Sequence, residues 1–112
     1  MLELKDFEAA YNKVQEVVLP TKLIKSDYFS DQTGNDVYLK PENMQLTGAY
    51  KIRGAYYKIS TLSEEEKAKG LITASAGNHA QGVALAAARQ GVKATIVMPT
   101  TTPLLKVNLS LI

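Results

Sequence analysis

Residues 71–98 read LITASAGNHAQGVALAAARQGVKATIVM, and the pattern of apolar residues changes twice along this segment. The apolar run 71–74 predicts a buried strand, and residues 77–90 predict a helix whose alanine-rich middle suits close packing and which ends at Gly91. The run 94–98 predicts a second buried strand. Strand, helix and strand in this order form the unit of a parallel sheet, so we expect an α/β fold with a parallel sheet flanked by helices.

The residues before this unit predict two further helices. The first begins at about Tyr50, because apolar residues recur at helical spacing in Ile52, Ala55, Tyr56 and Ile59. Ser63 and Glu66 have the spacing of a capping box, which predicts the start of a short helix that ends at Gly70. After the second strand, Thr102 and Pro103 predict the start of one more helix.

The N-terminal segment predicts a helix that Pro20 stops, because its apolar residues form a stripe at Leu4, Phe7, Tyr11, Val14 and Val18. Such a stripe needs a surface to cover, so we expect this helix to dock. Residues 21–36 carry turn-forming residues and predict an irregular stretch, whereas 37–40 predict a short strand. We therefore divide the chain into an N-terminal helix and arm, 1–36, and a partial α/β domain, 37–112.

Composition narrows the classes of function. The chain has 112 residues, enough for one domain, and is 46% hydrophobic and 21% charged. Its net charge of +2, without a basic run, argues against nucleic acid and against an anionic membrane. There is no cysteine, no spacing of metal ligands and no glycine-rich nucleotide loop. No apolar run could span a bilayer and no signal pattern opens the chain, so we expect a cytoplasmic protein.

One lysine, Lys51, stands in the first turn of the helix that we expect from Tyr50 onward. The partial positive charge of a helix N-terminus, together with nearby Arg53, favours the neutral form of an amine. A neutral amine attacks aldehydes to form a Schiff base, so Lys51 is a candidate catalytic residue. From charge alone, an ordinary surface lysine is the alternative.

The segment Ser75–His79 lies between a predicted strand end and a predicted helix start. Ligands of open α/β sheets bind at the carboxyl ends of strands, and the N–H groups of a helix N-terminus suit an anion. Gly77 would let a ligand approach the backbone, and Asn78 offers an amide that could donate to a phenolate. The alternative is that Ser75 or Asn78 only caps the helix. We assign the backbone N–H of His79 to the site rather than its ring.

Three segments together resemble one enzyme family. They read KPENMQ at 40–45, GAYKIRGA at 48–55 and SAGNHAQG at 75–82. They resemble the threonine/serine dehydratases, pyridoxal-phosphate (PLP) enzymes of the tryptophan-synthase-β-like fold, also called fold type II. The similarity runs from about Leu19 to Lys106. The residues after Lys51 resemble the dehydratases more than cysteine synthase or threonine synthase, with serine racemase the nearest alternative.

The resemblance implies a role for each candidate residue. Lys51 would hold PLP as a Schiff base and then remove the α-proton of the substrate. Tyr50 would lie beside the cofactor ring, and Asn78 would donate to the PLP 3′-oxygen. The substrate carboxylate would be held by Ser75, Gly77, Asn78 and His79.

The resemblance also implies a reaction and an incomplete enzyme. L-threonine or L-serine would be converted to 2-oxobutanoate or pyruvate with release of ammonia, in a parent protein that is a homo-oligomer. The chain resembles an N-terminal part, or small domain, of such an enzyme. The family's glycine-rich phosphate loop lies downstream, so we expect the 112-residue chain to be inactive alone. The alternatives are a serine racemase-like enzyme and a truncated, non-catalytic product that associates with a full-length relative. The closing residues, 109–112, do not resemble the family.

Overall fold

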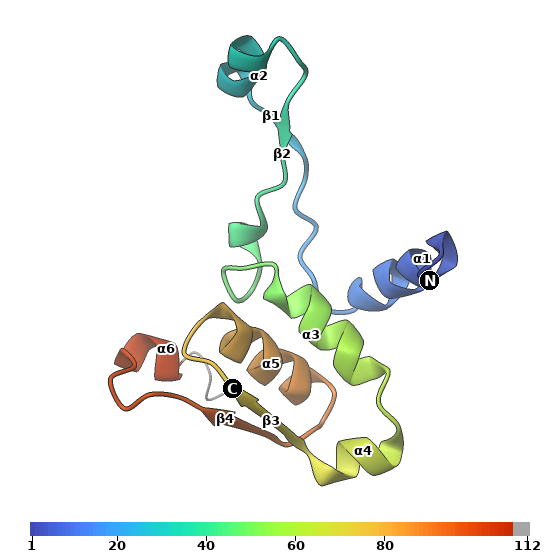
Figure 1. Ribbon diagram of the computed structural model, residues 1–112, viewed down its shortest axis with the longest axis vertical. Coiled ribbons are helices and arrows are strands. Elements are labelled where there is room, and N and C mark those ends of the chain that lie inside the picture. The colour runs from blue at the N-terminus through green and yellow to red at the C-terminus, as the bar shows by residue number, and fades with distance from the viewer. Residues whose placement is uncertain (109–112) are drawn as a thin grey trace.

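The computed structural model describes residues 1–108, so the departure from the family at 109–112 lies outside the described residues. Figure 1 shows how the elements follow one another along the chain. They are α1 (Leu4–Val14), β1 (Ile24–Lys25), α2 (Asp27–Thr33), β2 (Tyr38–Leu39), the 3-10 turn η1 (Glu42–Met44), α3 (Lys51–Ser60), α4 (Glu64–Lys69), β3 (Leu71–Ala74), α5 (Asn78–Arg89), β4 (Ala94–Val97) and α6 (Leu104–Asn108).

The predicted strand–helix–strand unit is confirmed. β3 and β4 pair in parallel, with Leu71 opposite Ala94 and Ala74 opposite Val97, and α5 connects them. The helix begins after Gly77 and its end is followed by Gly91, whose φ of 66° is the left-handed conformation that glycine adopts without strain. The predicted α/β fold, with helices beside a parallel pair of strands, is therefore confirmed.

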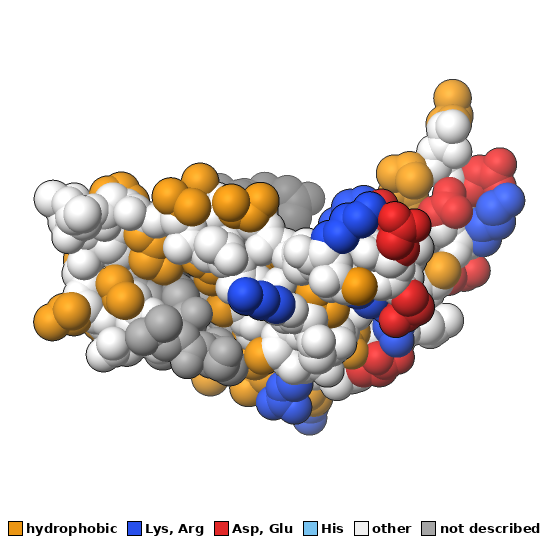
Figure 2. Space-filling model, turned by 90° about the horizontal axis from the view of Figure 1, so that it is seen from below, with side chains coloured by type: hydrophobic (Ala, Val, Ile, Leu, Met, Phe, Trp, Pro, Cys, Tyr) orange, Lys and Arg blue, Asp and Glu red, His pale blue; other side chains and the backbone are white. Residues whose placement is uncertain are grey.

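The two strands are not fully buried, which corrects the prediction. One face of the sheet is partly covered, whereas the other carries exposed side chains, with Ile72 77% and Val97 51% accessible. We call this the bare face, formed by Ile72, Ala74, Thr95 and Val97. The cause is that α5 and α3 lie on one side of the strands (Figure 1). In Figure 2, hydrophobic side chains gather toward the side of β4 and α6, while charged ones gather over α4 and α1.

The core lies where α3 packs against α5. The four residues of the predicted α3 stripe are all buried, and Ile52 has no accessible surface. Ala86 and Ala87 of α5 are equally inaccessible, as expected of an alanine-rich helix in close contact. Tyr56 in this core donates its hydroxyl to Glu16 at 2.8 Å, and burial together with this bond raises the pKa of Tyr56.

Helix α1 docks only at its end, which corrects the expected helix to Val18. Regular helix stops at Val14, and a tighter turn follows in which the Val17 N–H donates to the Val14 carbonyl at 3.1 Å. Val14 and Val17 are buried, but Leu4, Phe7 and Tyr11 remain at least 60% accessible. The predicted apolar stripe is therefore real, yet most of it is uncovered in the described chain.

Residues 19–45 form a projecting segment that we call the hairpin arm (Figure 1). Its strands β1 and β2 pair antiparallel. At its base, the Gln45 side chain accepts from the Leu19 N–H at 3.0 Å and donates to the Leu19 carbonyl at 2.9 Å. The arm raises the radius of gyration to 16.7 Å, compared with roughly 13 Å for a compact domain of this length.

The arm contains a helix that we did not predict. Residues 21–36 were expected to be irregular, but α2 begins after Ser26, whose Oγ accepts from the Phe29 N–H at 3.3 Å. It ends at Gly34, where φ is 68°. Serine and glycine are common both at the ends of helices and in turns, so in a segment this short they do not distinguish a helix from a turn. The division of the chain at residue 36 stays a prediction.

Candidate active site

The site is built on the first turn of α3. Gly48, with φ of 65°, turns the chain into this helix, and its N–H donates to the Gln45 carbonyl at 2.7 Å. Lys51 is the first residue of α3, directly after Tyr50. The Lys51 Nζ lies 5.3 Å from the centroid of the Tyr50 ring, within the range of a cation–π contact. The predicted amine and the predicted aromatic neighbour are therefore adjacent in space as well as in sequence.

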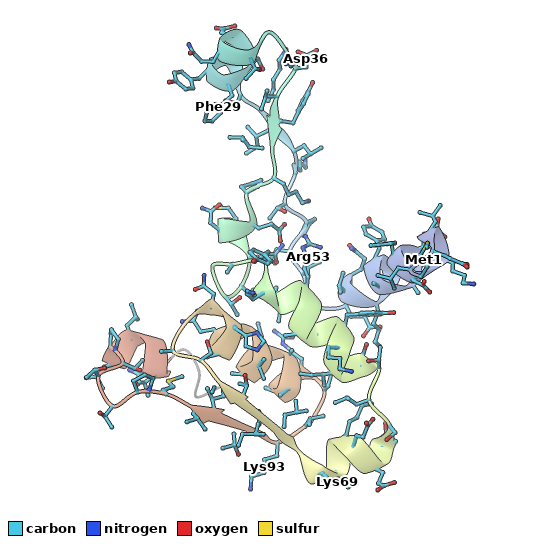
Figure 3. All side chains as sticks on the ribbon, in the orientation of Figure 1. Met1, Phe29, Asp36, Arg53, Lys69 and Lys93 are labelled. Atoms are coloured by element: carbon cyan, nitrogen blue, oxygen red, sulfur yellow. The ribbon has the colours of Figure 1, made fainter. Side chains whose placement is uncertain are left out.

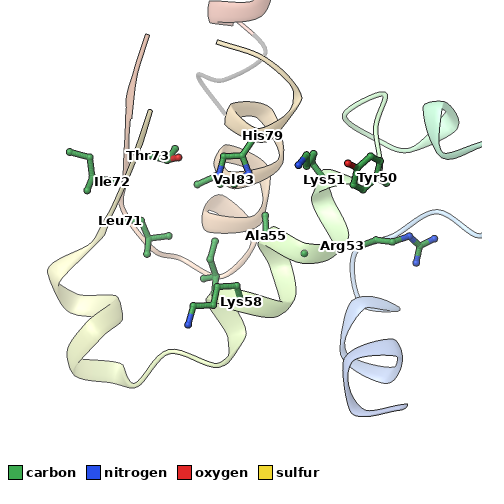
Figure 4. A pocket seen from close by; sticks show the side chains of 12 residues that line it. Tyr50, Lys51, Arg53, Ala55, Lys58, Leu71, Ile72, Thr73, His79 and Val83 are labelled. Carbon is green, nitrogen blue, oxygen red and sulfur yellow. The ribbon is translucent and has the colours of Figure 1, made fainter. Parts of the chain in front are cut away.

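Lys51, Tyr50 and His79 line one cavity of about 470 Å³ (Figure 4). The rest of its wall is formed largely by apolar residues of α3, β3 and α5, which include Ala55, Ile59, Leu71, Ile72 and Val83. Lys58 and Thr73 also line it and were not predicted. Lys58 lies seven residues after Lys51 on α3, so helical spacing could have indicated that both face one side. The start of α5 thus reaches the cavity of the predicted lysine through His79.

The predicted substrate loop lies at the carboxyl end of β3. The Ser75 N–H extends the sheet by donating to the Val97 carbonyl at 3.0 Å, and its Oγ accepts from the Gly77 N–H at 3.2 Å. Ser75, Gly77 and Asn78 do not line the cavity itself. They form the turn that leads directly to His79, which does.

The N-terminus of α5 suits an anionic group. Gly77 is the N-cap, so no side chain satisfies the N–H groups of the first turn there. A Cβ placed on Gly77 would meet no atom within 4 Å, so there is open space beside the N-cap residue. The Lys51 amine could react with an aldehyde, and the free N–H groups at the start of α5 could bind a carboxylate. The described residues therefore fit the aldehyde of PLP, which the Lys51 amine could capture, with an anionic group at the nearby helix start.

Arg53 forms an ion pair with Glu42. Its guanidinium forms a two-point contact with Glu42, with Nε to Oε2 at 2.7 Å and a terminal nitrogen to Oε1 at 2.9 Å. Figure 3 shows Arg53 at the base of the hairpin arm. Arg53, aided by the Thr21 hydroxyl at 2.7 Å, lowers the pKa of Glu42 to about 2. The charge of Arg53 is therefore matched by Glu42, and its role is to join the arm to the first turn of α3.

Among residues 1–108, no helix is both long and apolar enough to cross a membrane. Within the same residues, no group of at least three metal-binding side chains comes together.

Comparison with known proteins places these features in a family. The sequence pattern of the family described as "Pyridoxal-phosphate dependent enzyme" matches residues 14–111. The L-threonine ammonia-lyase of Thermotoga maritima is 54% identical over 108 residues, which are 96% of this chain and 27% of that protein. The chain therefore spans about a quarter of the length of this relative.

Solved structures agree with the fold. The processed form of threonine deaminase isoform 2 from Solanum lycopersicum superposes with a TM-score of 0.81 at 42% identity, over 97% of this chain and 31% of that one. Serine racemase from Dictyostelium discoideum gives a TM-score of 0.89 at 35% identity, over 97% of this chain and 36% of that one. The lysine-bearing helix, the uncapped helix beside it and the match over most of the chain lead to one conclusion: this chain belongs to the family of pyridoxal-phosphate dependent enzymes.

Proposed function

We propose that the complete protein carrying this sequence is a PLP-dependent L-threonine ammonia-lyase. It would convert L-threonine, and L-serine, to the 2-oxo acid and ammonia. The observation that supports this most directly is the placement of the Lys51 amine in a cavity shared with His79 at the uncapped start of α5. The 54% identity to an L-threonine ammonia-lyase favours this reaction over others in the family. Because the chain spans 27% of that relative, the proposal concerns the complete polypeptide and not residues 1–112 alone.

Each candidate residue receives a defined task. When bound, PLP supplies an aldehyde that captures amines and a ring that accepts the electron pair left when the α-proton departs. The Lys51 Nζ holds the cofactor and then carries that proton. The N–H groups at the start of α5, from Asn78 and His79, bind the substrate carboxylate, aided by Ser75 and Gly77. The Asn78 amide orients the cofactor through its 3′-oxygen, and the Tyr50 ring packs beside it.

The test uses the product of the native gene, purified from its own cells. Its intact mass is compared with 12.2 kDa, and it is then assayed for 2-oxo acid and ammonia from L-threonine. We expect a larger mass and turnover. Borohydride reduction followed by peptide mapping should locate PLP on Lys51. Lys51→Arg keeps a cation but should lose both the attachment and the turnover, whereas Lys69→Arg on exposed α4 is the matched control. PLP that remains attached in Lys51→Arg would show that the lysine is wrongly assigned.

A serine racemase-like activity is the second candidate, because the Dictyostelium discoideum serine racemase superposes with a TM-score of 0.89. Supplying L-serine separates the two. D-serine as the main product would favour the racemase, and pyruvate with ammonia would favour the lyase.

A non-catalytic role in association with a full-length relative is the third candidate, and it is motivated by the bare face of the sheet. An intact mass of 12.2 kDa, without turnover and with co-purification of a longer relative, would favour it. We also propose a cytoplasmic location, because a chain without cysteine suits a reducing compartment. The complete protein is further proposed to be a homo-oligomer.

A further inference from the structure

Helix α5 lies close to the first turn of α3 at Gly82. A Cβ placed on Gly82 would lie 3.0 Å from the carbonyl carbon of Lys51, 3.2 Å from the N atom of Ile52 and 3.2 Å from the Cβ of Lys51. Two of these neighbours are backbone atoms, which cannot move aside as the end of a long side chain can. A methyl group at residue 82 therefore requires the first turn of α3, or α5 against it, to give by a few tenths of an ångström.

The surroundings leave little room for such a shift. Ile52, next to the contact, has no accessible surface, and Ala86, one turn along α5 from Gly82, has none. On its other side, the first turn of α3 is fixed to the hairpin arm through the bidentate pair of Arg53 and Glu42. Close-packed interiors transmit added volume as displacement. The segment that carries Lys51 is thus held between Gly82 and the arm.

We propose that Gly82 is a positioning residue for the Lys51 amine: its missing side chain sets the depth at which Lys51 enters the cavity. This rests on the proposed role of Lys51 as the residue that holds PLP. The inference goes further because it assigns Gly82, which lies outside the cavity wall, a task distinct from binding cofactor or substrate. It also explains why a glycine, which disfavours the interior of a helix, stands in the middle of α5.

The experiment substitutes Gly82→Ala in the native gene product. Alanine favours a helix, so by propensity alone it would stabilise α5. We expect instead that PLP attachment to Lys51, measured after borohydride reduction and peptide mapping, falls roughly tenfold. The displacement is a few tenths of an ångström, which is smaller than the misplacement of about 1 Å that costs about a hundredfold. The pH titration of the visible absorbance of the lysine-bound cofactor should also shift, because the amine sits in a changed environment.

The control is Ala86→Val. It adds volume to the same core from the same side of α5, one turn further from Lys51. We expect it to lower the melting temperature without moving the pH titration. If Gly82→Ala loads PLP and titrates as the unchanged protein does, the inference is wrong. If both variants shift the titration equally, Gly82 contributes only to packing and the inference is equally wrong.

A second measurement covers the case in which Gly82→Ala does not fold. In the unchanged protein, close contact with Gly82 should exclude water from the Ile52 N–H and slow its hydrogen exchange. The first-turn N–H groups of exposed α4, at Glu64 and Glu65, are the comparison. Exchange at Ile52 as fast as at these residues would overturn the inference. Failure of the unchanged protein to attach PLP at Lys51 would instead overturn the proposed function. Slow exchange at Ile52 would then still support the close contact between Gly82 and the first turn of α3.

Discussion

At the scale of single residues, Glu42 shows how a residue of the hairpin arm can pair with a charge that the sequence places next to Lys51. From the sequence, Arg53 is a cation two residues after Lys51 and is expected to act on the amine. In the structure, its guanidinium is held by Glu42 with bonds of 2.7 and 2.9 Å. The fold of the hairpin arm creates this pair, so spacing along the chain could not have predicted it.

The pair predicts a dependence of stability on acid. Arg53 lowers the pKa of Glu42 from 4.5 to about 2, so the folded state holds this proton less tightly than the unfolded chain. The stability that Glu42 contributes is therefore present above pH 4.5 and is lost as the pH falls toward 2. Glu42→Gln should cost about 2 kcal/mol at neutral pH and remove this part of the acid dependence. Urea unfolding across this pH range measures both, and an unchanged acid profile in the variant would contradict the assignment.

Lys51 and Tyr50 were both predicted from the sequence, because a motif and the start of a helix coincide there. The structure brings them together with His79 in one cavity. The position of the His79 side chain was not predicted, because a sequence shows which helix turn a residue occupies but not which neighbouring helix faces it. Gly82 was missed for the same reason, since its importance lies in the 3.0 Å approach to another helix.

At the scale of elements, local signals predicted well wherever a helix carries its own caps. Helix α4 follows the expected pattern: the Ser63 Oγ accepts from the Glu66 N–H at 3.2 Å, and the Ser63 N–H donates to the Glu66 carboxylate at 2.8 Å. Prediction failed at α2, where the same kinds of residue occupy a short helix inside the arm. A short helix offers no periodic pattern to separate it from a turn.

The capping box predicts the result of Ser63→Ala. Loss of the cap should lower the free energy of unfolding by about 1 kcal/mol. The pKa of the Glu66 carboxyl, which its bonds with Ser63 hold below the ordinary value, should rise. NMR titration of Glu66 and urea unfolding measure the two effects. Ser63→Thr keeps the hydroxyl and should behave as the unchanged chain; equal losses in both variants would argue against the cap.

At the scale of the whole molecule, the sequence predicted that the two strands pair in parallel, but not that one of their faces stays exposed. Continuous apolar runs are typical of strands that are buried on both faces, and this is what residues 71–74 and 94–98 resemble. In the described chain, α5 packs on one face, and Ile72 and Val97 on the other face remain accessible. The apolar runs therefore predict a second covering layer, which residues 1–108 do not supply.

The bare face predicts that the 112-residue chain associates with itself. Replacing Ile72 and Val97 together by lysine, as Ile72→Lys and Val97→Lys, should weaken association by roughly tenfold or more, because less apolar area is removed from water. Sedimentation at several concentrations measures the effect. The matched control is Leu4→Lys with Phe7→Lys on uncovered α1, which we expect to weaken association less. Equal effects from both pairs would show that the bare face has no special part in association.

The packing of α3 against α5 also bears on the speed of folding. Apart from Val17, the buried core comes from residues 52–92, and the parallel strands beside it begin and end within residues 71–97. Contacts between residues that are near in sequence form early, because little loop-closure entropy opposes them. A nascent chain can therefore assemble the helix that carries Lys51 as soon as Val97 has left the ribosome. The lysine can then stand on a formed scaffold before any later part of a longer polypeptide has folded.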